Sequence, residues 1–452
     1  MMGLPSLDRV ASDDTLPGKV DTVVVGGGIV GASTALALVD AGVSVALVEK
    51  GEIGAEQSGR NWGWVRQMGR DPAEIPLAIE SNRLWRQMRQ RIGADTGYRE
   101  TGIVYACATK REVAEHEAWL KVARQYDLDS RLLRGNELAE ILPGGRRRFL
   151  AGLYTANDGR AEPSMATAAI AEGARNRGAR IVTQCAVRGI ETAAGRVCGV
   201  VTERGSIACA SVVLAGGAWS RLFAGNLGIE FPQLKVLGSA ARVEGVEDGL
   251  DMPVGGGSFS FRKRLDGGYT IGMRNVNIAP IVPDSFRLFA DFAPTFIRNW
   301  RELRIRIGGR FLEEWHTPRR WDLDEASPFE SVRILDPVAN ESINRKGLAN
   351  LAKVFPAFAK ARITHNWSGL IDVTPDAVPV ISPVDAIPGF FLASGFSGHG
   401  FGIGPGAGQL MSDLVRGVAP CVDPTPFRLA RFGKKPSARY QESTIAKRRV
   451  AK

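Results

Sequence analysis

A glycine motif near the start of the chain has the residue types and spacing of a phosphate-binding turn. It runs Gly26-x-Gly28-x-x-Gly31, and Glu49 follows downstream. The first glycine permits the turn, the second lets the backbone approach a pyrophosphate, and the third lets a helix pack closely on a sheet. Backbone N–H groups at the start of that helix attract phosphates. Glu49 can accept both ribose hydroxyls, and its charge disfavours a 2′-phosphate. The motif therefore predicts a dinucleotide, NAD or FAD rather than an NADP-type ligand.

The segments around the motif are those that such a turn needs. Val20–Val25 is a short apolar run rich in β-branched residues, which predicts a buried strand. Ala32–Ala41 has helical composition and ends at Gly42, a natural C-cap, and Val43–Glu49 is the next apolar strand. Together they form one strand–turn–helix–strand unit of an α/β fold.

A loop rich in glycine, tryptophan and arginine follows at Gly51–Asp71. Guanidinium groups bind carboxylates through two parallel hydrogen bonds. An arginine such as Arg66 is therefore the right residue type to hold a carboxylate. Trp62 and Trp64 either border the pocket or pack beneath the loop.

Three later motifs extend the pattern. They are Leu-Ala-Gly-Gly-Ala-Trp ending at Trp219, the segment Trp367–Asp376, and the glycine-rich segment Ala393–Gly408. In order and spacing they resemble the D-amino-acid oxidase superfamily of FAD-dependent oxidoreductases, especially its sarcosine oxidase, glycine oxidase and D-amino-acid dehydrogenase branch. The resemblance runs from Val20 to about Gly417, and it does not cover the Arg- and Trp-rich stretch 284–321.

This resemblance implies a function. FAD would oxidise the C–N bond of a D-amino acid, an N-alkyl amino acid or an imino acid. The hydride would pass to flavin N5, and the resulting imine would hydrolyse. The expected partners are a small amino acid or amine with a carboxylate, and an electron acceptor that is oxygen, a quinone or a protein. No metal is expected.

The resemblance also implies the architecture, a discontinuous Rossmann-like FAD-binding domain with an inserted antiparallel-sheet substrate domain. We expect residues 15–100, 151–230 and 361–430 to form the three parts of the FAD-binding domain. Residues 101–150 and 231–360 would form the substrate domain, and residues 431–452 a basic tail.

A helix expected at Pro405–Val415 would direct its first N–H groups at the flavin N1–C2=O edge, where negative charge collects on reduction. Gly400, Gly402, Gly404 and Gly406 would let the backbone lie against the flavin ring, and His399 would shape the flavin environment. We expect contacts with FAD from Gly26, Gly28, Ile29, Val30, Gly31, Glu49, Lys50, Ser58, Arg60, Asn61, Trp62, Val187, Gly216, Trp219, Gly398, His399, Gly400, Phe401 and Gly402.

The chain differs from the family that it resembles at the positions where some relatives attach the flavin covalently. Sarcosine oxidase uses a cysteine at the position of Gly369, and no cysteine lies nearby here. The segment Ser58–Asn61 also lacks the histidine of some relatives. We therefore expect non-covalent FAD.

The chain also lacks the residues with which these relatives bind the substrate carboxylate. Ile371 and Gly402 stand where relatives carry an arginine and a lysine that bind the carboxylate. The resemblance implies that Arg66 replaces them, since it aligns within one residue with the carboxylate-binding arginine of sarcosine oxidase; a surface salt bridge is the alternative. Arg274 falls near the place of an active-site histidine of sarcosine oxidase. Two arginines would suit a substrate with an extra acidic or polar group. The aromatic residues Phe259 and Phe261 are expected to form an apolar wall, although core packing is the alternative for one of them.

Composition leaves other function classes open. At 452 residues the chain is long enough for two intergrown domains. Most of its net charge of +10 lies in residues 431–452, so the body is nearly balanced and nucleic acid is not expected. Five scattered cysteines and an acidic N-terminal segment favour a cytoplasmic protein without a signal peptide. The alternatives are a subunit of a hetero-oligomeric sarcosine- or proline-type dehydrogenase, a nucleic-acid-linked flavoprotein that uses the basic tail, and weak docking of that tail on a membrane surface.

Overall fold

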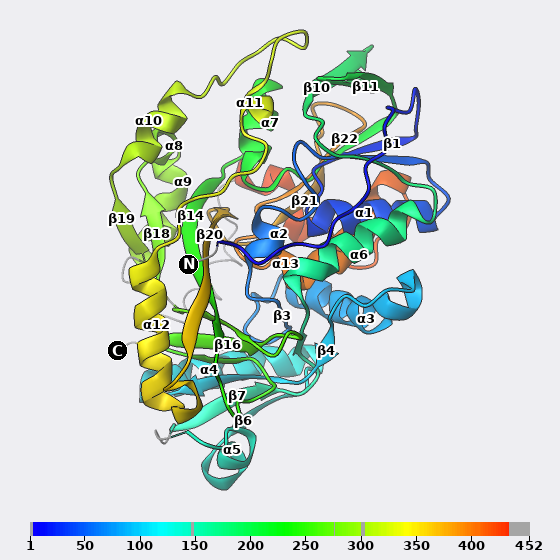
Figure 1. Ribbon diagram of the computed structural model, residues 1–452. Helices are drawn as coiled ribbons and strands as arrows, with labels where there is room; N and C mark the ends of the chain where they lie inside the picture. Colours follow the sequence, from blue (N-terminus) through cyan, green and yellow to red (C-terminus); the bar gives the residue numbers. More distant parts are fainter. Residues whose placement is uncertain (1–2, 146–148, 275, 300–302, 434–452) are drawn as a thin grey trace.

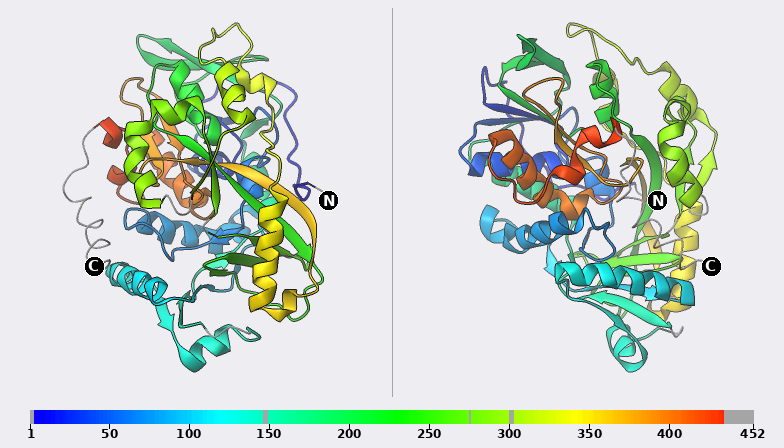
Figure 2. Two further views of the ribbon diagram at one scale, coloured as in Figure 1. Left: turned by 90° about the vertical axis from the view of Figure 1, so that its left-hand side faces the viewer. Right: turned by 180° about the vertical axis from the view of Figure 1, so that it is seen from behind.

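The computed structural model describes residues 3–145, 149–274, 276–299 and 303–433. Two large β-sheets dominate it, with helices packed on both (Figures 1 and 2). One sheet is almost entirely parallel and the other is mostly antiparallel. The predicted α/β fold class is therefore confirmed. The expected basic tail falls largely on residues 434–452, which lie outside the described residues.

The parallel sheet has the strand order β21-β22-β13-β1-β2-β9, with only β21 antiparallel to its neighbour. Its strands are β1 (Thr22–Val25), β2 (Val45–Val48), β9 (Arg180–Val182), β13 (Ser211–Leu214), β21 (Val380–Pro383) and β22 (Phe390–Ser394). One face is covered by α1 (Ile29–Asp40), α3 (Ile75–Ile92), α6 (Pro163–Arg175) and α13 (Gly400–Arg416), which gather on the same side in Figure 1.

Alternation along β1 explains why this sheet needs cover on both faces. Val24 packs into the core beneath the helices, while Val23 and Val25 pack into a second core on the opposite face. That second core is closed by a three-stranded sheet of β10 (Val187–Ala193), β11 (Arg196–Thr202) and β12 (Gly205–Ala208).

The larger sheet has the order β19-β18-β14-β17-β16-β15-β5-β7-β6, and β20 pairs with β14 along its whole length. Its strands are β5 (Ile103–Cys107), β6 (Ser130–Leu133), β7 (Ala151–Thr155), β14 (Leu234–Glu244), β15 (Val254–Gly256), β16 (Phe259–Lys263), β17 (Tyr269–Gly272), β18 (Asn277–Pro280), β19 (Leu303–Arg306) and β20 (Arg362–Val373). Since β20 continues into β21, it carries the chain from this sheet to the parallel one. The exact domain boundaries stay a prediction.

The remaining elements surround these sheets. The other helices are α2 (Gln57–Arg60), α4 (Lys110–Ala123), α5 (Gly135–Ile141), α7 (Ser220–Asn226), α8 (Pro283–Arg287), α9 (Phe289–Asn299), α10 (Gly309–His316), α11 (Pro328–Ser331) and α12 (Glu341–Val354). A small sheet joins β3 (Trp64–Val65), β8 (Gly159–Arg160) and β4 (Arg99–Glu100). Short 3₁₀ turns lie at Arg124–Tyr126, Gly217–Trp219, Pro356–Phe358, Thr425–Phe427 and Leu429–Gly433. No helix of the described ranges is both long and apolar enough to cross a membrane.

The start of α13 differs from the sequence prediction. The helix begins at Gly400 rather than Pro405, which lies inside it. A Cβ added at Gly404 would lie 2.8 Å from Cγ1 of Ile29 in α1, and one at Gly406 would lie 2.8 Å from the Leu77 carbonyl of α3. These two glycines thus allow close helix packing, and the expectation that they lie against the flavin ring is wrong.

Candidate active site

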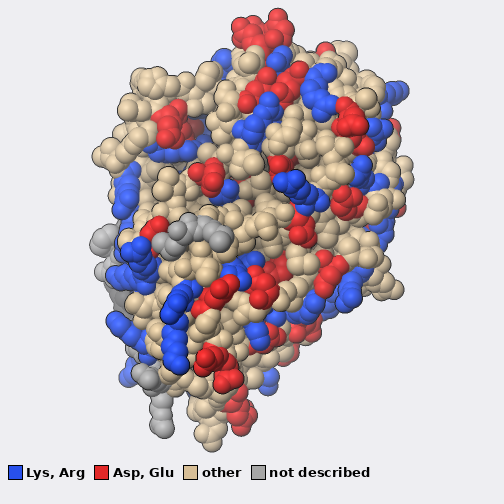
Figure 3. Space-filling view, viewed as in Figure 1, with Lys and Arg blue, Asp and Glu red and all other residues tan. Residues whose placement is uncertain are grey.

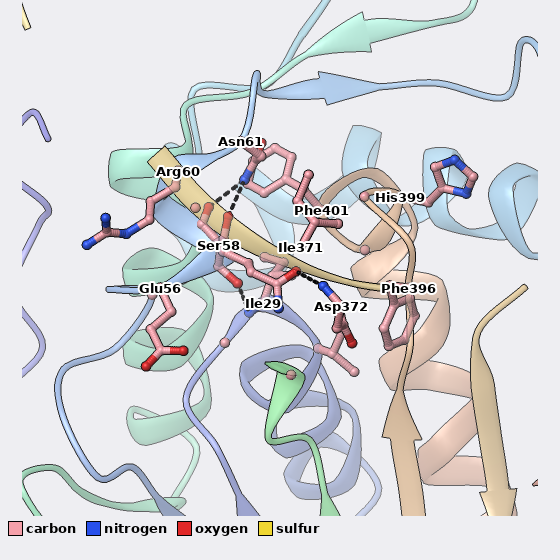
Figure 4. Close-up of a pocket in the computed structure, with 18 of the residues that line it drawn as sticks. Ile29, Glu56, Ser58, Arg60, Asn61, Ile371, Asp372, Phe396, His399 and Phe401 are labelled. Carbon is pink, nitrogen blue, oxygen red and sulfur yellow. Dashed lines mark hydrogen bonds between the residues drawn. The ribbon is translucent and has the colours of Figure 1, made fainter. Parts of the chain in front are cut away.

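A cavity of about 500 Å³ lies where the two sheets meet. Segments from the glycine turn, the loop after β2, β14, β20 and the start of α13 line it (Figure 4). Its volume falls in the range of cofactor and small-molecule sites. Arg66, Arg274 and the residues predicted to contact FAD line this cavity, with the exceptions of Gly31, Gly404 and Gly406.

Gly26 and Gly31 are required by the geometry of the turn. Gly26 has a φ of +108°, and a Cβ there would lie 2.5 Å from the Ala215 carbonyl oxygen. A Cβ at Gly31 would lie 1.9 Å from the Gly26 carbonyl oxygen, so Gly31 allows α1 to pack against the turn. A Cβ at Gly28 would meet only Ser58 Oγ, at 3.2 Å, which leaves this backbone open to the cavity.

Glu49 lies at the end of β2, where it faces the turn. Its Oε2 accepts a hydrogen bond from the Gly27 N–H at 2.6 Å, and its Oε1 accepts one from the Gly51 N–H at 2.8 Å. Burial raises its pKa above the usual glutamate value. Each oxygen keeps a further lone pair, so the carboxylate can still accept two hydroxyl groups.

Lys50 is held by protein groups at the edge of the cavity. Its Nζ donates to Glu56 Oε1 at 2.7 Å and to the carbonyls of Val332 and Arg333 at 2.9 and 2.8 Å. The same Nζ lies 4.7 Å from the centre of the Trp219 ring, and Trp219 Nε1 donates to Glu56. Lys50 and Trp219 therefore form a wall of the cavity.

Side-chain hydrogen bonds hold the loop through α2 in place, both to its own backbone and to the backbone of α1 and β20. Ser58 Oγ accepts from the Ile29 N–H at 2.9 Å, and Asn61 Nδ2 donates to the Ser58 carbonyl at 2.6 Å (Figure 4). Arg60 is buried and donates to the Ala55 and Ser368 carbonyls. Trp62, Val187 and Gly216 complete this part of the lining.

The first turn of α13 borders the same cavity. Gly398, Gly400, Phe401 and Gly402 line it, and Gly398 has a φ of +83°. The first N–H groups of a helix lack intrahelical partners and give its N-terminus a partial positive charge. This end of the helix can therefore interact with an electron-rich edge of a ligand.

His399 pairs with a residue that sequence analysis missed. Its Nδ1 lies 3.0 Å from Oε2 of the buried Glu74 at the start of α3. Burial lowers the pKa of His399. Burial also acts to raise the pKa of Glu74, but His399, Arg70 and Arg66 together outweigh it and lower that pKa. We assign a neutral imidazole that donates to a carboxylate. Figure 4 shows the His399 ring apart from the group around Ser58. The sequence gives little indication of the pair, because Glu74 and His399 are 325 positions apart.

Arg66 and Arg274 come together over one aromatic ring. The Arg274 guanidinium carbon lies 3.8 Å from the centre of the Tyr105 ring, and that of Arg66 lies 5.7 Å from it. Arg66 also donates to the Met68 carbonyl. The ring centres of Trp64 and Tyr105 lie 5.8 Å apart. At this end of the cavity the positive charges of the two arginines therefore lie beside an aromatic surface. Sequence analysis missed Tyr105, since it lies within a buried apolar strand.

The predicted apolar wall is wrong for both phenylalanines. Phe259 and Phe261 belong to the core of the larger sheet, where they contact Phe355. Their strand turns these rings away from the cavity. Phe396 and Phe401 supply aromatic lining instead.

These residues fit a dinucleotide cofactor. The open backbone at Gly28 lies at the start of α1, where phosphates are favoured, and Glu49 retains acceptors for ribose hydroxyls. The cavity then continues to the first turn of α13. In the described ranges, no three His, Cys, Asp or Glu side chains are arranged to hold a metal ion.

Comparison with known proteins agrees with this geometry. The sequence model of the family described as FAD dependent oxidoreductase (DAO) matches residues 21–414. The structure of L-amino acid deaminase from Proteus myxofaciens in complex with anthranilate is similar, with a TM-score of 0.92 and 37% identity over 95% of this chain and 97% of that chain. L-amino acid deaminase from Proteus vulgaris gives a TM-score of 0.90 and 33% identity over 94% of this chain and 100% of that chain.

A curated relative shows the same likeness at lower identity. Human mitochondrial sarcosine dehydrogenase is 25% identical over 92% of this chain, but the match covers 42% of the human protein. The chain thus spans less than half the length of this relative.

Proposed function

Because the chain belongs to the DAO family of FAD-dependent oxidoreductases, we propose that it carries out the oxidative deamination of an L-α-amino acid with a large apolar side chain. The predicted family and the predicted FAD cofactor are confirmed by the family match. The observation that carries the proposal is the pairing of Arg66 and Arg274 over Tyr105 in the same cavity as the glycine turn. The likeness to two L-amino acid deaminases supports the L-configuration.

In this proposal the chain's own residues divide the work. The turn at Gly28 and the start of α1 hold the pyrophosphate, Glu49 holds the ribose, and the first turn of α13 faces the pyrimidine edge. Bound FAD supplies the acceptor for a hydride from the substrate α-carbon. The aromatic lining excludes water around the reacting carbon.

Arg66 and Arg274 have two effects on an amino acid. Their positive charges attract the carboxylate, which orients the α-carbon. They also repel an ammonium group, so the amine binds in its neutral form. A neutral amine has the lone pair that must stabilise the carbon as its hydride leaves. No separate catalytic base is therefore required.

The experiment that tests this proposal is a screen of enantiomers with the purified full chain. Matched L- and D-forms of phenylalanine, leucine and methionine are mixed with the protein without oxygen, and loss of the flavin colour is followed. We expect the L-forms alone to bleach the flavin and to release ammonia and a 2-oxo acid on reoxidation. Bleaching by D-forms, or by N-methyl amino acids alone, would contradict the proposal.

The electron acceptor and the alternatives are separate questions. Oxygen, a quinone and a protein acceptor remain candidates, and cytoplasmic location stays a prediction. On the face shown in Figure 3, Lys and Arg are intermixed with Asp and Glu, and no uniform basic surface for nucleic acid is visible there. Turnover by the purified chain without a partner would argue against the subunit alternative.

A further inference from the structure

Arg70 is a buried cation that is not fully satisfied by the protein. It is 3% exposed, and its Nε donates to the Arg66 carbonyl at 3.3 Å. Its Nη1 is buried without a hydrogen-bond partner, yet Arg70 lines the cavity. Among the described arginines, Arg160 also has buried guanidinium nitrogens without a partner, but it does not line this cavity.

The carboxylates nearest to Arg70 are already engaged. Glu74 is paired with His399. Asp158 accepts hydrogen bonds from the backbone N–H groups of Gln67 at 2.7 Å and Met68 at 3.2 Å. Burial, and then the like charge of Arg66, lower the pKa of Arg70 to about 10, so it stays protonated at neutral pH. The charges of Glu74 and Asp158 act on Arg70, but neither carboxylate forms a hydrogen bond or ion pair with its guanidinium, so Nη1 lacks the acceptor that a buried donor normally has. An anionic group of a ligand would supply that acceptor.

The position of Arg70 shows where that anion would bind. A Cβ added at Gly402, in the first turn of α13, would lie 3.4 Å from Arg70 Nη2 and 3.0 Å from the Trp64 carbonyl oxygen. The Arg70 guanidinium therefore lies directly beside the first turn of α13. The helix N-terminus adds positive character at the same place.

Trp64 supplies a second unpartnered donor. Its indole Nε1 is buried and has no hydrogen-bond partner, and Trp64 lines the same cavity. A tryptophan N–H in a protein interior normally finds an acceptor. Two buried donors on one cavity, one of them charged, match a carboxylate better than a neutral group.

We propose that Arg70 binds the substrate carboxylate through Nη1, with Trp64 Nε1 as a second donor. This inference rests on the proposed function and deepens it. Arg66 and Arg274 then form the cationic approach over Tyr105, while Arg70 makes the buried contact that distinguishes a carboxylate from an uncharged group.

The test measures ligand binding to the FAD-containing full chain, independently of turnover. The probes are benzoate and its neutral isostere benzamide, whose dissociation constants come from changes in the flavin absorption spectrum. We expect the wild type to favour benzoate and Arg70→Met to weaken benzoate by about 30-fold or more, the effect of removing one partner of a buried charge pair. Benzamide should change by less than about 3-fold, and Arg70→Lys should recover part of the preference.

Three further measurements keep the test decisive. Trp64→Phe removes only the indole N–H and should weaken benzoate by about 5-fold. Arg111→Met, a change of an arginine whose side chain is 77% exposed, is the matched control and should leave both constants unchanged. Sulfite affinity, which reports positive charge beside the flavin, should change by less than about 3-fold in Arg70→Met.

The results that overturn the inference are distinct. An unchanged benzoate constant in Arg70→Met would remove Arg70 from the site, and an unchanged benzoate constant in Trp64→Phe would remove the second donor. An equal loss of benzoate and benzamide, or a large change in sulfite affinity with benzoate unaffected, would also overturn the inference. A wild type that binds benzoate no better than benzamide would also reject it. If benzoate binding follows Arg70 but no L-amino acid bleaches the flavin, the proposed function fails and the anion site remains.

Discussion

At the scale of single residues, the cavity joins two electrostatic environments. Glu49 places a carboxylate at the dinucleotide turn, while Arg66, Arg70 and Arg274 make the substrate end positive. In the proposed function the two ends bind different chemical groups: hydroxyls and phosphates at one end, and a carboxylate at the other. The charge of each end therefore follows from a few side chains, and each can be changed separately.

Glu49→Gln should weaken FAD binding by about 10-fold to 100-fold, because hydrogen bonds to a charged acceptor contribute about 1.5–3 kcal/mol. The change keeps the side-chain shape and removes the charge. Equilibrium dialysis with the flavin fluorescence of the outer solution measures the effect. Glu140→Gln, a change of an exposed glutamate of α5 that does not line the cavity, is the control. Full FAD occupancy of the Glu49 variant after long dialysis would remove Glu49 from the ribose site.

His399 should make stability depend on pH in the acid range. Its folded pKa lies below the ordinary histidine value of 6.5, because burial disfavours the imidazolium. The unfolded chain then binds the proton more readily, so this stability is complete above pH 6.5 and is lost as the pH falls toward the folded pKa. We expect His399→Asn to have a flatter profile of melting temperature against pH below 6.5. Parallel profiles of the two proteins would show that His399 does not titrate in this way.

At the scale of elements, α13 combines two requirements in one glycine-rich segment. Its first turn borders the cavity, and its next turns lie against α1 and α3. Glycines at 400 and 402 serve the first requirement, while Gly404, Gly406 and Gly408 serve the second. The sequence alone does not separate these roles, since both need an absent side chain.

Gly408→Ala should destabilise the protein by about 1–3 kcal/mol, the range for overpacking a core. The added Cβ would lie 2.4 Å from the Ser33 carbonyl carbon, which is backbone and cannot turn aside. Urea unfolding of the FAD-containing protein measures the change. Gly225→Ala in α7 is the matched control, because a Cβ there meets nothing within 4 Å. Equal stability of the two variants would contradict the packing role.

At the scale of the whole molecule, the cavity depends on segments that are far apart in sequence. The dinucleotide turn comes from the first 50 residues, Tyr105 and Arg274 come from the larger sheet, and α13 comes from the end of the described chain. The strand β20 connects the two sheets, so the relative placement of the two cavity ends depends on its pairing with β14.

The same assembly predicts how the flavin is held. No cysteine lines the cavity, and the described cysteines are free thiols, so the structure offers no thiol for a flavin bond there. We expect acid precipitation of the yellow protein to release all FAD into the supernatant, where absorbance and mass spectrometry identify it. Colour that stays in the pellet would show a covalent bond.

Local patterns in the sequence were sufficient for the turn at Gly26–Gly31 and for Glu49 at the end of the second strand, because strand and helix periods and glycine spacing are local properties. The arginines at 66 and 274 were predicted from the resemblance to sarcosine oxidase, and their roles stay a prediction. Only the tertiary structure shows that Glu74 pairs with His399, that Tyr105 lies beneath two arginines, and that Arg70 fills the space beside Gly402. Such contacts join residues brought together by sheet pairing and helix packing. One chain alone carries no local signal for them, and their geometry decides which charged groups remain free to bind a ligand.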